Sequence, residues 1–467
     1  PPPPAQAAGP TLLSMVGESA APATPNQKLL EAKVRLHKRL IEELNLGAVE
    51  KLPVDELRRE IHGMISGWVV AERLPLNAKE LDGFVTEVMD EMTGLGPLEA
   101  LLKDPSIADI LINGHQNIFV ERRGLLEPVP SLFKDEAHLM RIIQKIVSAV
   151  GRRVDESSPL CDARLLDGSR FNCAVRPIGV DGPLVSIRKF SKHKLGLHQL
   201  VEFGALTKNM AEVLAAAVHA RKTTIISGGT GTGKTTMLNA LSAFIPEDER
   251  LITIEDAAEL QLQQEHVITL ESRPPNIEGQ GEIRIRELVR NALRMRPDRI
   301  IVGEVRGAET LDMLQAMNTG HEGSLTTIHA NSPRDALSRL ETLVMTGGVE
   351  LPHRAIREQI SSAFDVLVQI SRLVDGSRRV THITEVLRME SDVITLQDLF
   401  LAKPPDEDSV VPMRASRLLQ PLACTGLKPH FLEKMAANGV LLPPTFFRVG
   451  APGGRPTFGA APYGGLQ

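Results

Sequence analysis

Residues 228–235, with the sequence Gly-Gly-Thr-Gly-Thr-Gly-Lys-Thr, constrain the fold of this chain more than any other stretch. The glycines at its first and sixth positions and the closing Lys-Thr pair satisfy the pattern G-x-x-x-x-G-K-[ST]. A β-branched apolar run at 223–226 comes before it, and residues 236–241 after it have helical character. A strand, a glycine loop and a helix in this order form a phosphate-binding loop, because glycines let successive N–H groups point at phosphate oxygens.

The loop also supplies the side chains that a triphosphate needs. Lys234 would neutralise the β- and γ-phosphates, and the Thr235 hydroxyl would ligate Mg²⁺. We therefore predict a site for a nucleoside triphosphate, with ATP and Mg²⁺ as the bound species. The residues predicted to bind it are Gly228, Gly229, Thr230, Gly231, Thr232, Gly233, Lys234, Thr235 and Thr236.

Composition narrows the class of protein. The chain has 467 residues, which is room for two or three domains, and its hydrophobic content of 42% is ordinary for a globular protein. A net charge of −5 gives no basic footprint for nucleic acid, and three cysteines exclude a disulfide scaffold. Since no apolar run approaches the about 18 residues of a membrane helix and no signal segment opens the chain, we expect a cytoplasmic protein without its own membrane segment.

The texture of the sequence changes along the chain and suggests its organisation. Helical spacing at 54–70 and 78–92 follows an earlier helical stretch, so we expect a small bundle, which could equally be a docking module for a partner. Strands are predicted at 108–112, 117–120 and 182–187, and a helix at 137–150. The predicted domains are 1–27 disordered, 28–93 helical bundle, 94–192 mixed α/β domain, 193–204 linker, 205–400 phosphate-loop domain, 401–449 C-terminal subdomain and 450–467 flexible tail.

Two apolar strands after the loop end in carboxylates. A strand at 250–254 runs into Glu255 and Asp256, and a strand at 299–302 runs into Gly303 and Glu304. Sites of parallel sheets lie beyond the carboxyl ends of their strands, where a carboxylate can hold Mg²⁺ or polarise water. Glu255 is the predicted catalytic base and Glu304 the predicted magnesium-side carboxylate. Either acid could instead cap a helix or form a salt bridge.

Histidines and arginines complete the candidate residues. His321 and His329 flank a β-branched run, and without companion ligands they do not predict a zinc site. An imidazole beside a γ-phosphate could sense hydrolysis, so both histidines are candidate catalytic residues. A helix is predicted at 283–296, between the two carboxylate strands. Four arginines stand out before the loop: Arg164, Arg170, Arg176 and Arg188.

Four motifs follow one another in a fixed order: the phosphate loop, the segment Ile-Glu-Asp-Ala-Ala-Glu-Leu at 254–260, the segment at 294–304 that ends in Val-Gly-Glu, and the two-histidine segment at 319–331. This set resembles the secretion and type IV pilus ATPase superfamily, in which they are the Walker A, aspartate box, Walker B and histidine box. Residues 104–114 and 162–172 are similar to its Tad/Flp pilus assembly branch. The resemblance covers about 91–400, and the tail around 426–446 shares it.

The resemblance implies an α/β fold with a RecA-like P-loop ATPase domain, a mixed α/β N-terminal domain and an extra N-terminal helical bundle. It also implies a homo-hexameric motor with ATP between two lobes of each subunit. Arg170 and Arg188 lie at the stretches that match the family's arginine fingers. Such a motor would work at the inner face of the cytoplasmic membrane and pull on a platform protein that adds pilin subunits, with no nucleic acid expected.

Three other functions stay open at this stage. The first is a conjugation- or secretion-type translocation ATPase within the same superfamily. The second is a phosphotransferase, which the phosphate loop alone permits. The third is a nucleotide-binding switch or scaffold without hydrolysis, against which the two intact carboxylates Glu255 and Glu304 argue.

Overall fold

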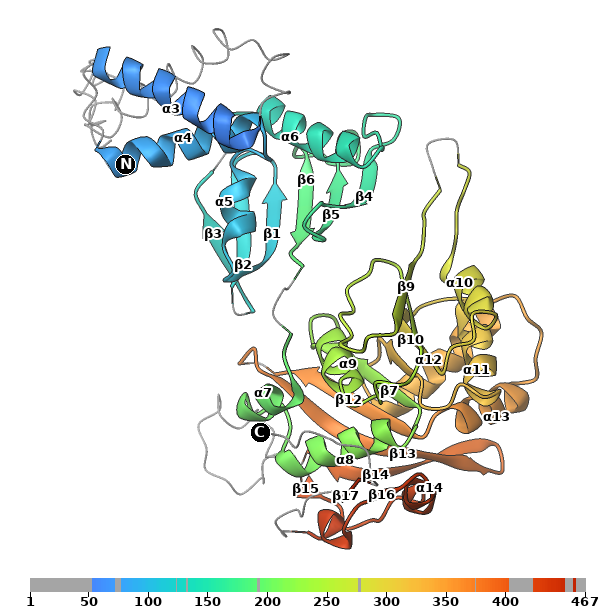
Figure 1. Ribbon diagram of the computed structural model, residues 1–467. Coiled ribbons are helices and arrows are strands. Elements are labelled where there is room, and N and C mark those ends of the chain that lie inside the picture. Colours follow the sequence, from blue (N-terminus) through green and yellow to red (C-terminus); the bar gives the residue numbers. More distant parts are fainter. Residues whose placement is uncertain are drawn as a thin grey trace, which may run out of the picture. The chain divides into compact units, whose positions relative to one another are not determined.

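The computed structural model describes residues 53–71, 77–122, 124–131, 133–190, 194–275, 279–373, 375–402, 423–449 and 457–458 (Figure 1). The segment predicted to be disordered, the helical stretch before residue 53 and nearly all of the predicted tail lie outside these residues. The chain divides into two compact units, Pro1–Pro105 with Leu132–Ile146, and Ser106–Ser131 with Val147–Gln467. The domain boundaries drawn from the sequence stay predictions.

The first unit contains the helices that the sequence pattern predicts. They are α3 (Val54–Ala71), α4 (Ala78–Met92), α5 (Leu98–Lys103) and the first part of α6 (Glu136–Ala149). Leu57, Ile61 and Ile65 recur every four residues, so α3 presents one apolar stripe, which packs with Phe84 and Val88 of α4. This spacing is why the two helices form a pair.

The ends of α4 are closed by side chains. Asn77 and Glu80 form a capping box at its start, in which each side chain accepts a hydrogen bond from the backbone N–H of the other residue. At the other end, the Lys145 ammonium of α6 donates to the carbonyl oxygens of Met92, at 3.1 Å, and Gly94, at 2.6 Å. These contacts satisfy backbone groups that a helix leaves unpaired at its ends.

The second unit begins with a six-stranded antiparallel sheet in the order β3-β2-β1-β6-β5-β4. Its strands are β1 (Ile107–Asn113), β2 (Asn117–Arg122), β3 (Leu125–Val129), β4 (Leu160–Arg164), β5 (Arg170–Ala174) and β6 (Leu184–Arg188). Successive side chains of a strand point to opposite faces, and the buried positions alternate accordingly, as in Val185 and Ile187. The three strands predicted in this region are confirmed.

A nine-stranded sheet forms the rest of the second unit, in the order β15-β14-β13-β12-β7-β11-β10-β8-β9. The six strands from β12 to β9 in this order pair in parallel, and β12 to β15 pair antiparallel. The strands are β7 (Thr224–Gly228), β8 (Leu251–Glu255), β9 (Val267–Glu271), β10 (Arg299–Val305), β11 (Leu325–Ile328), β12 (Val366–Arg372), β13 (Arg378–Glu390), β14 (Val393–Leu401) and β15 (Ala423–Cys424). This is the predicted RecA-like phosphate-loop domain.

Helices cover both faces of the nine-stranded sheet (Figure 1). They are α7 (Leu197–Glu202), α8 (Lys208–His219), α9 (Lys234–Ser242), α10 (Ile285–Ala292), α11 (Glu309–Asn318), α12 (Pro333–Thr346), α13 (His353–Ala363) and α14 (Leu432–Ala437). Successive side chains of the central strand β7 point to opposite faces of the sheet. Ile226 therefore packs with α8 and α9 on one face, and Ile225 with α10 to α13 on the other. A short pair, β16 (Val440–Leu441) and β17 (Thr457–Phe458), and the 3₁₀ turn η1 (Pro444–Phe447) follow α14.

Helix α10 is shorter than the prediction of 283–296. It begins at Ile285 and ends at Ala292, and Arg296 has a left-handed backbone with φ of 56°. Pro297 follows Arg296, and the residue before a proline is disfavoured in the helical conformation. The apolar stripe located the helix, but the proline limits its end.

Arg299 connects three elements at the amino end of β10. Its guanidinium is fully buried and pairs with both carboxylate oxygens of Glu249, at 2.6 and 2.8 Å. It also donates to the carbonyl oxygens of Val218 in α8, at 2.6 Å, and of Gly323 before β11, at 3.1 Å. A buried charge is tolerated when it is paired and hydrogen-bonded in this way.

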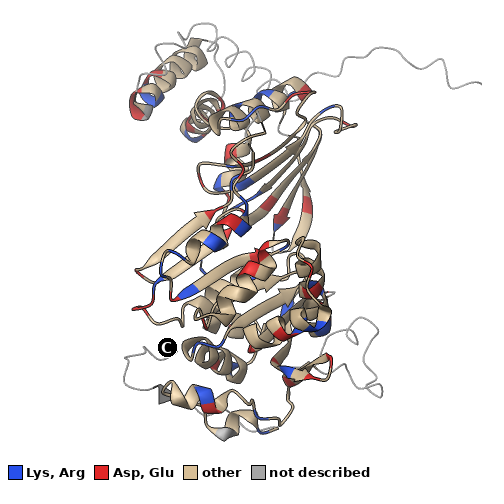
Figure 2. Cartoon of the chain, turned by 90° about the vertical axis from the view of Figure 1, so that its right-hand side faces the viewer, with Lys and Arg blue, Asp and Glu red and all other residues tan. Residues whose placement is uncertain are grey.

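Basic and acidic residues are both spread along the described elements (Figure 2). Among the helices that the structure describes, none has the length and apolar composition to cross a membrane.

Candidate active site

The phosphate loop joins the end of β7 to the start of α9. Gly231 and Gly233 have φ of 68° and 95°, which favour glycine, and Gly233 is the residue from which α9 begins. A Cβ on Gly228 would stand 2.6 Å from both the Ile370 carbonyl oxygen and the Thr232 hydroxyl. The loop conformation therefore needs glycine at these positions, as the motif predicts.

Lys234 lies folded onto the loop. Its ammonium donates to the carbonyl oxygens of Gly228, at 3.1 Å, and Gly229, at 3.0 Å. Burial lowers the pKa of Lys234, Glu304 acts in the opposite direction, and Arg306 and Arg188 add to the lowering. Within the described part of the chain, these two carbonyl oxygens are the hydrogen-bond partners of the ammonium, which can exchange them for phosphate oxygens. The residues present fit a bound triphosphate.

Glu255 ends β8 and is 4% exposed. Its carboxylate accepts hydrogen bonds from the backbone N–H groups of Glu259, at 2.9 Å, and Leu260, at 3.1 Å. Burial nevertheless raises its pKa to about 7. A carboxyl group with such a pKa ionises in the range where general bases operate. The absence of a side chain at Gly303 makes room for it, since a Cβ there would stand 2.8 Å from Glu255 Cγ.

Glu304 interacts electrostatically with Lys234 and Arg306. It is near the end of β10, forms an ion pair with Arg306, and raises the pKa of Lys234 against the effect of burial. Arg306 also pairs with Asp256 at 3.4 Å. The ends of β8 and β10 are therefore joined by one arginine between two carboxylates.

The two histidines lie beyond opposite ends of the central strand β11. His329 follows β11, whose last residue Ile328 pairs with Ser227, one residue before the phosphate loop. Burial lowers the pKa of His329, and the positive charge of Lys234 adds to this effect. Both effects favour the neutral form of this imidazole beside the loop.

His321 instead precedes the amino end of β11. Its Nδ1 lies 3.1 Å from the Ala316 carbonyl oxygen, and the nearby Gly323 N–H donates to the Thr223 hydroxyl before β7. Within one chain, the structure separates His321 from the phosphate loop by the length of the strand. The β-branched run that the two histidines flank forms β11, so the strand keeps the two imidazoles apart.

Three arginines stand side by side on the six-stranded sheet. Arg164 pairs in register with Arg170, and Arg170 with Arg188, across β4, β5 and β6. Like charges directly opposite one another destabilise a sheet. Each is balanced by a carboxylate: Arg164 by Glu271 at 2.8 Å, Arg170 by Asp162 at 2.7 Å, and Arg188 by Asp109 at 3.2 Å. We call this set of Arg164, Arg170 and Arg188 the arginine row.

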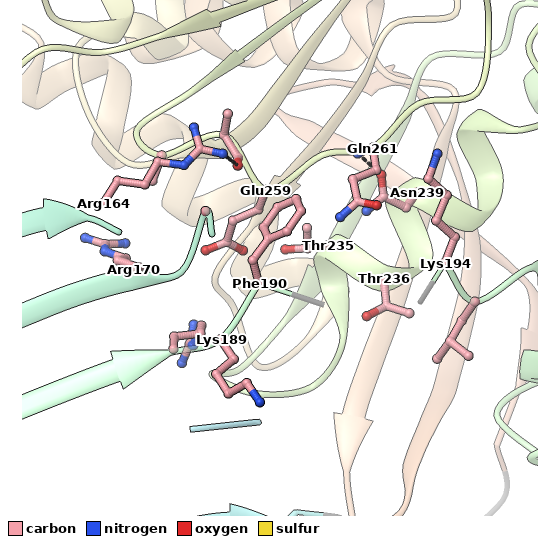
Figure 3. Close-up of a pocket in the computed structure, with 15 residues that line it drawn as sticks. Arg164, Arg170, Lys189, Phe190, Lys194, Thr235, Thr236, Asn239, Glu259 and Gln261 are labelled. Atoms are coloured by element: carbon pink, nitrogen blue, oxygen red, sulfur yellow. Dashed lines mark hydrogen bonds between the residues drawn. The ribbon is translucent and has the colours of Figure 1, made fainter. Parts of the chain in front are cut away.

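The arginine row and the start of α9 line the same cavity of 310 Å³ (Figure 3). The cavity brings the two predicted arginines Arg170 and Arg188 together with Thr235 and Thr236. Other lining residues are Arg164, Gly168, Lys189, Phe190, Lys194, Leu195, Asn239, Ala257, Ala258, Glu259 and Gln261. Five cationic side chains, among them the arginine row, line this cavity next to the phosphate loop together with the carboxylate of Glu259.

Some residues of the site escaped the sequence analysis. Arg306 directly follows β10 and stands two residues after Glu304, and the sequence analysis did not name it because no motif includes it. Arg164 was named without a role, because its place in the arginine row depends on strand register. Arg176 lies beyond the end of β5, where its guanidinium donates to the Val180 carbonyl oxygen at 3.4 Å, so it is not part of the row.

Comparison with known proteins gives matches over the part of the chain that contains this site. Residues 91–425 match the family model described as Type II/IV secretion system protein. The chain is 38% identical over 309 residues to the "Putative conjugal transfer protein Rv3659c" of Mycobacterium tuberculosis, which spans 65% of this chain and 87% of that protein. It is 31% identical over 330 residues to the type IV secretion system protein VirB11 of Bartonella quintana, over 62% of this chain and 92% of that protein.

Among solved structures, the VirB11 ATPase from the Brucella suis type IV secretion system matches with 29% identity and a TM-score of 0.34, over 62% of this chain and 95% of that one. The pilus retraction motor PilT with bound ADP matches with 18% identity and a TM-score of 0.46, over 63% of this chain and 83% of that one. The family model covers well over half of the sequence and includes all four motifs. The chain therefore belongs to the Type II/IV secretion system protein family, within the superfamily of type II/IV secretion ATPases.

Proposed function

We propose that this chain is the ATP-hydrolysing motor of a Tad/Flp pilus assembly machine or of a closely related secretion machine. The observation that carries the proposal is the arginine row, which lines the same cavity as Thr235 and Thr236 of the phosphate loop. A phosphate loop alone serves many reactions, whereas cations from a separate sheet suit a nucleotide held between two lobes.

The loop residues Gly228 to Thr236 would hold ATP, and Thr235 with Glu304 would hold Mg²⁺. Bound Mg²⁺ supplies positive charge to the β- and γ-phosphate oxygens. Glu255, with its pKa near 7, would accept the proton of the attacking water. Arg188 and Arg170 would stabilise charge on the γ-phosphate as arginine fingers. His329 would sense the γ-phosphate next to Lys234, and the separation described above leaves His321 without a proposed role.

The proposed assembly is a homo-hexamer at the cytoplasmic face of the inner membrane, where a membrane-embedded platform protein would receive the motion. The arginine row supports a shared site, because its residues come from a different sheet than the phosphate loop. Contacts from these arginines to bound nucleotide would couple the two sheets. The spread of both basic and acidic residues supports a protein partner over nucleic acid, since nucleic-acid surfaces are usually basic.

A conjugation-type translocation ATPase is the second candidate. It is favoured by the names of similar proteins, since the relative in Mycobacterium tuberculosis carries a conjugal transfer name. Both candidates use the same chemistry and differ in what the motor moves.

The biochemical test measures phosphate release from Mg-ATP without any acceptor. We expect turnover by the wild type, loss of nucleotide binding in Lys234→Ala, and retained binding with little turnover in Glu255→Gln. Lys208→Ala, an exposed lysine at the start of α8, is the matched control and should behave as wild type. Absence of phosphate release by the folded wild type, in hexamer-promoting conditions, would overturn the motor proposal. Wild-type turnover in Glu255→Gln would move the role of base to Glu304.

The cellular test separates the two candidates. In the source organism, deletion of the gene should remove surface pili, and the wild-type gene but not the Lys234→Ala variant should restore them. Loss of DNA transfer between cells with intact piliation would instead establish the conjugation function.

A further inference from the structure

Two of the three cysteines face each other on the six-stranded sheet. Cys161 of β4 pairs directly in register with Cys173 of β5, and both thiols are free. They lie on the buried face, 4% and 0% exposed, on the same face as Phe171 and Val185. The third cysteine, Cys424, lies in β15 of the other sheet.

The ladder of β4 and β5 sets the distance between the two cysteines. The Leu165 N–H donates to the Ser169 carbonyl oxygen, and the Val175 N–H donates to the Pro159 carbonyl oxygen. Because hydrogen-bonded pairs recur every second residue, Cys161 and Cys173 occupy such a pair, with Cα atoms about 5.5 Å apart. This separation falls within the range of about 4.4–6.8 Å that a disulfide spans.

The two thiols differ in their position in the sheet and in the charges near them. The interaction with the Cys173 thiol lowers the pKa of Cys161 to about 7, and the positive charge of Arg152 adds to this effect. The interaction with Cys161 raises the pKa of Cys173. Cys161 lies on the edge strand β4 and near Arg152, so we assign it as the thiol that the oxidant meets first, and Cys173 as the thiol that resolves its oxidised form.

We propose that Cys161 and Cys173 are a modification site, a dithiol that hydrogen peroxide oxidises to an intramolecular disulfide. The Cys161 thiolate attacks one peroxide oxygen, the O–O bond breaks, and the leaving hydroxide takes a proton to become water. Cys173 sulfur then attacks the Cys161 sulfenic acid, the S–O bond breaks, and a second water leaves with the Cys173 proton. Two thiols lose two electrons and two protons, and one peroxide becomes two waters.

The position of the two cysteines in the sheet bears on how peroxide would reach them and on what a disulfide between them would restrain. Among the strands that the structure describes, β4 is at the edge of its sheet and pairs on one side only, so local opening there would expose the thiols to a small oxidant. The disulfide would close the hairpin that carries Arg164 and Arg170 on its opposite face. Oxidation would therefore restrain the strands that hold two members of the arginine row.

The test is mass spectrometry of the full-length native protein after peroxide treatment and alkylation of remaining thiols in denaturant. Trypsin cleaves after Arg164 and Arg170, so the two cysteines fall on separate peptides that only a disulfide joins. We expect a linked Cys161–Cys173 peptide within one chain, an alkylated Cys424, and reversal by dithiothreitol. Peroxide-treated Cys424→Ser, the matched control, should give the same linked peptide.

Single variants distinguish a site from incidental oxidation. Cys173→Ser should stop at a sulfenic acid on Cys161, which a dimedone adduct records, whereas Cys161→Ser should gain no adduct on Cys173. Circular dichroism checks that both variants are folded. The proposal is overturned if the native wild type yields no linked peptide while Cys424 is oxidised, or if the linkage joins two chains.

Discussion

The Glu255 side chain at the end of β8 lies against Gly303 near the end of β10. A methyl group at position 303 would stand 2.8 Å from Glu255 Cγ, and the buried carboxylate has no free direction to move because two backbone N–H groups hold it. We predict that Gly303→Ala displaces Glu255, destabilises the fold by about 1–3 kcal/mol, and lowers turnover more than nucleotide binding.

Thermal melting, nucleotide titration and phosphate release measure these three effects. Gly67→Ala is the control, because Gly67 in α3 has open space around its Cα, and alanine favours a helix. A Gly303→Ala protein with the stability and turnover of wild type would show that Glu255 is not confined.

The acidity of Glu255 gives a second prediction at this scale. Burial raises its pKa from 4.5 to about 7, so its contribution to stability is complete below pH 4.5 and is lost as the pH rises through about 7. Turnover should change in the opposite direction, since a general base must be ionised. Between roughly pH 5 and pH 8, wild type should therefore lose melting temperature and gain turnover. Both trends should be weaker in Glu255→Gln, and equal slopes in the two proteins would contradict the assignment.

At the scale of elements, the arginine row depends on three strands meeting in one register. Arg188 is 57% exposed on its side chain, and one carboxylate holds it, so it can leave Asp109 for a phosphate. We predict that Arg188→Ala binds nucleotide but loses turnover by about 10³-fold. Arg188→Lys should rescue little, because an ammonium lacks the planar fork of a guanidinium.

Two controls belong to this prediction. Arg176→Ala removes an arginine that lies outside the row and should leave turnover unchanged. Melting of the nucleotide-free protein tests the packing alternative, in which Arg188→Ala would lower the midpoint. Normal turnover in a folded Arg188→Ala protein would exclude the finger.

The same elements show what a sequence can and cannot reveal. Strands β8 and β10 were predictable because each is an apolar run that leads to an acidic residue. The phosphate loop was predictable because its backbone conformation requires glycines that are visible in the sequence. The arginine row was not predictable from the sequence, because neither β4 nor β5 has a long apolar run. The register between these strands is set by their pairing in the folded sheet. The end of α10 was missed where Pro297 outweighs the apolar stripe. The roles of Glu255, Glu304 and the arginines remain proposals.

At the scale of the whole molecule, we predict a hexamer that forms with nucleotide. If the arginine row serves a site shared between subunits, a lone chain should bind ATP but turn it over slowly. Mass photometry with a non-hydrolysable ATP analogue measures the assembly, and turnover measured across protein concentrations shows whether activity follows it. Lys234→Ala is the control, since it should not assemble in response to nucleotide. A strictly monomeric protein with full turnover would contradict the shared site.

The buried guanidinium of Arg299 bears on how the phosphate-loop domain comes apart. It bonds at once to Glu249, to the end of α8 and to the turn before β11, so moving any one of these away strands a charge in an apolar interior. We therefore expect partial opening of this region to cost a large part of the free energy of unfolding the domain. The amide protons of β10 and of the adjacent strands β8 and β11 should exchange with solvent together, as one cooperative unit. The amide protons of the phosphate loop should exchange independently of this unit.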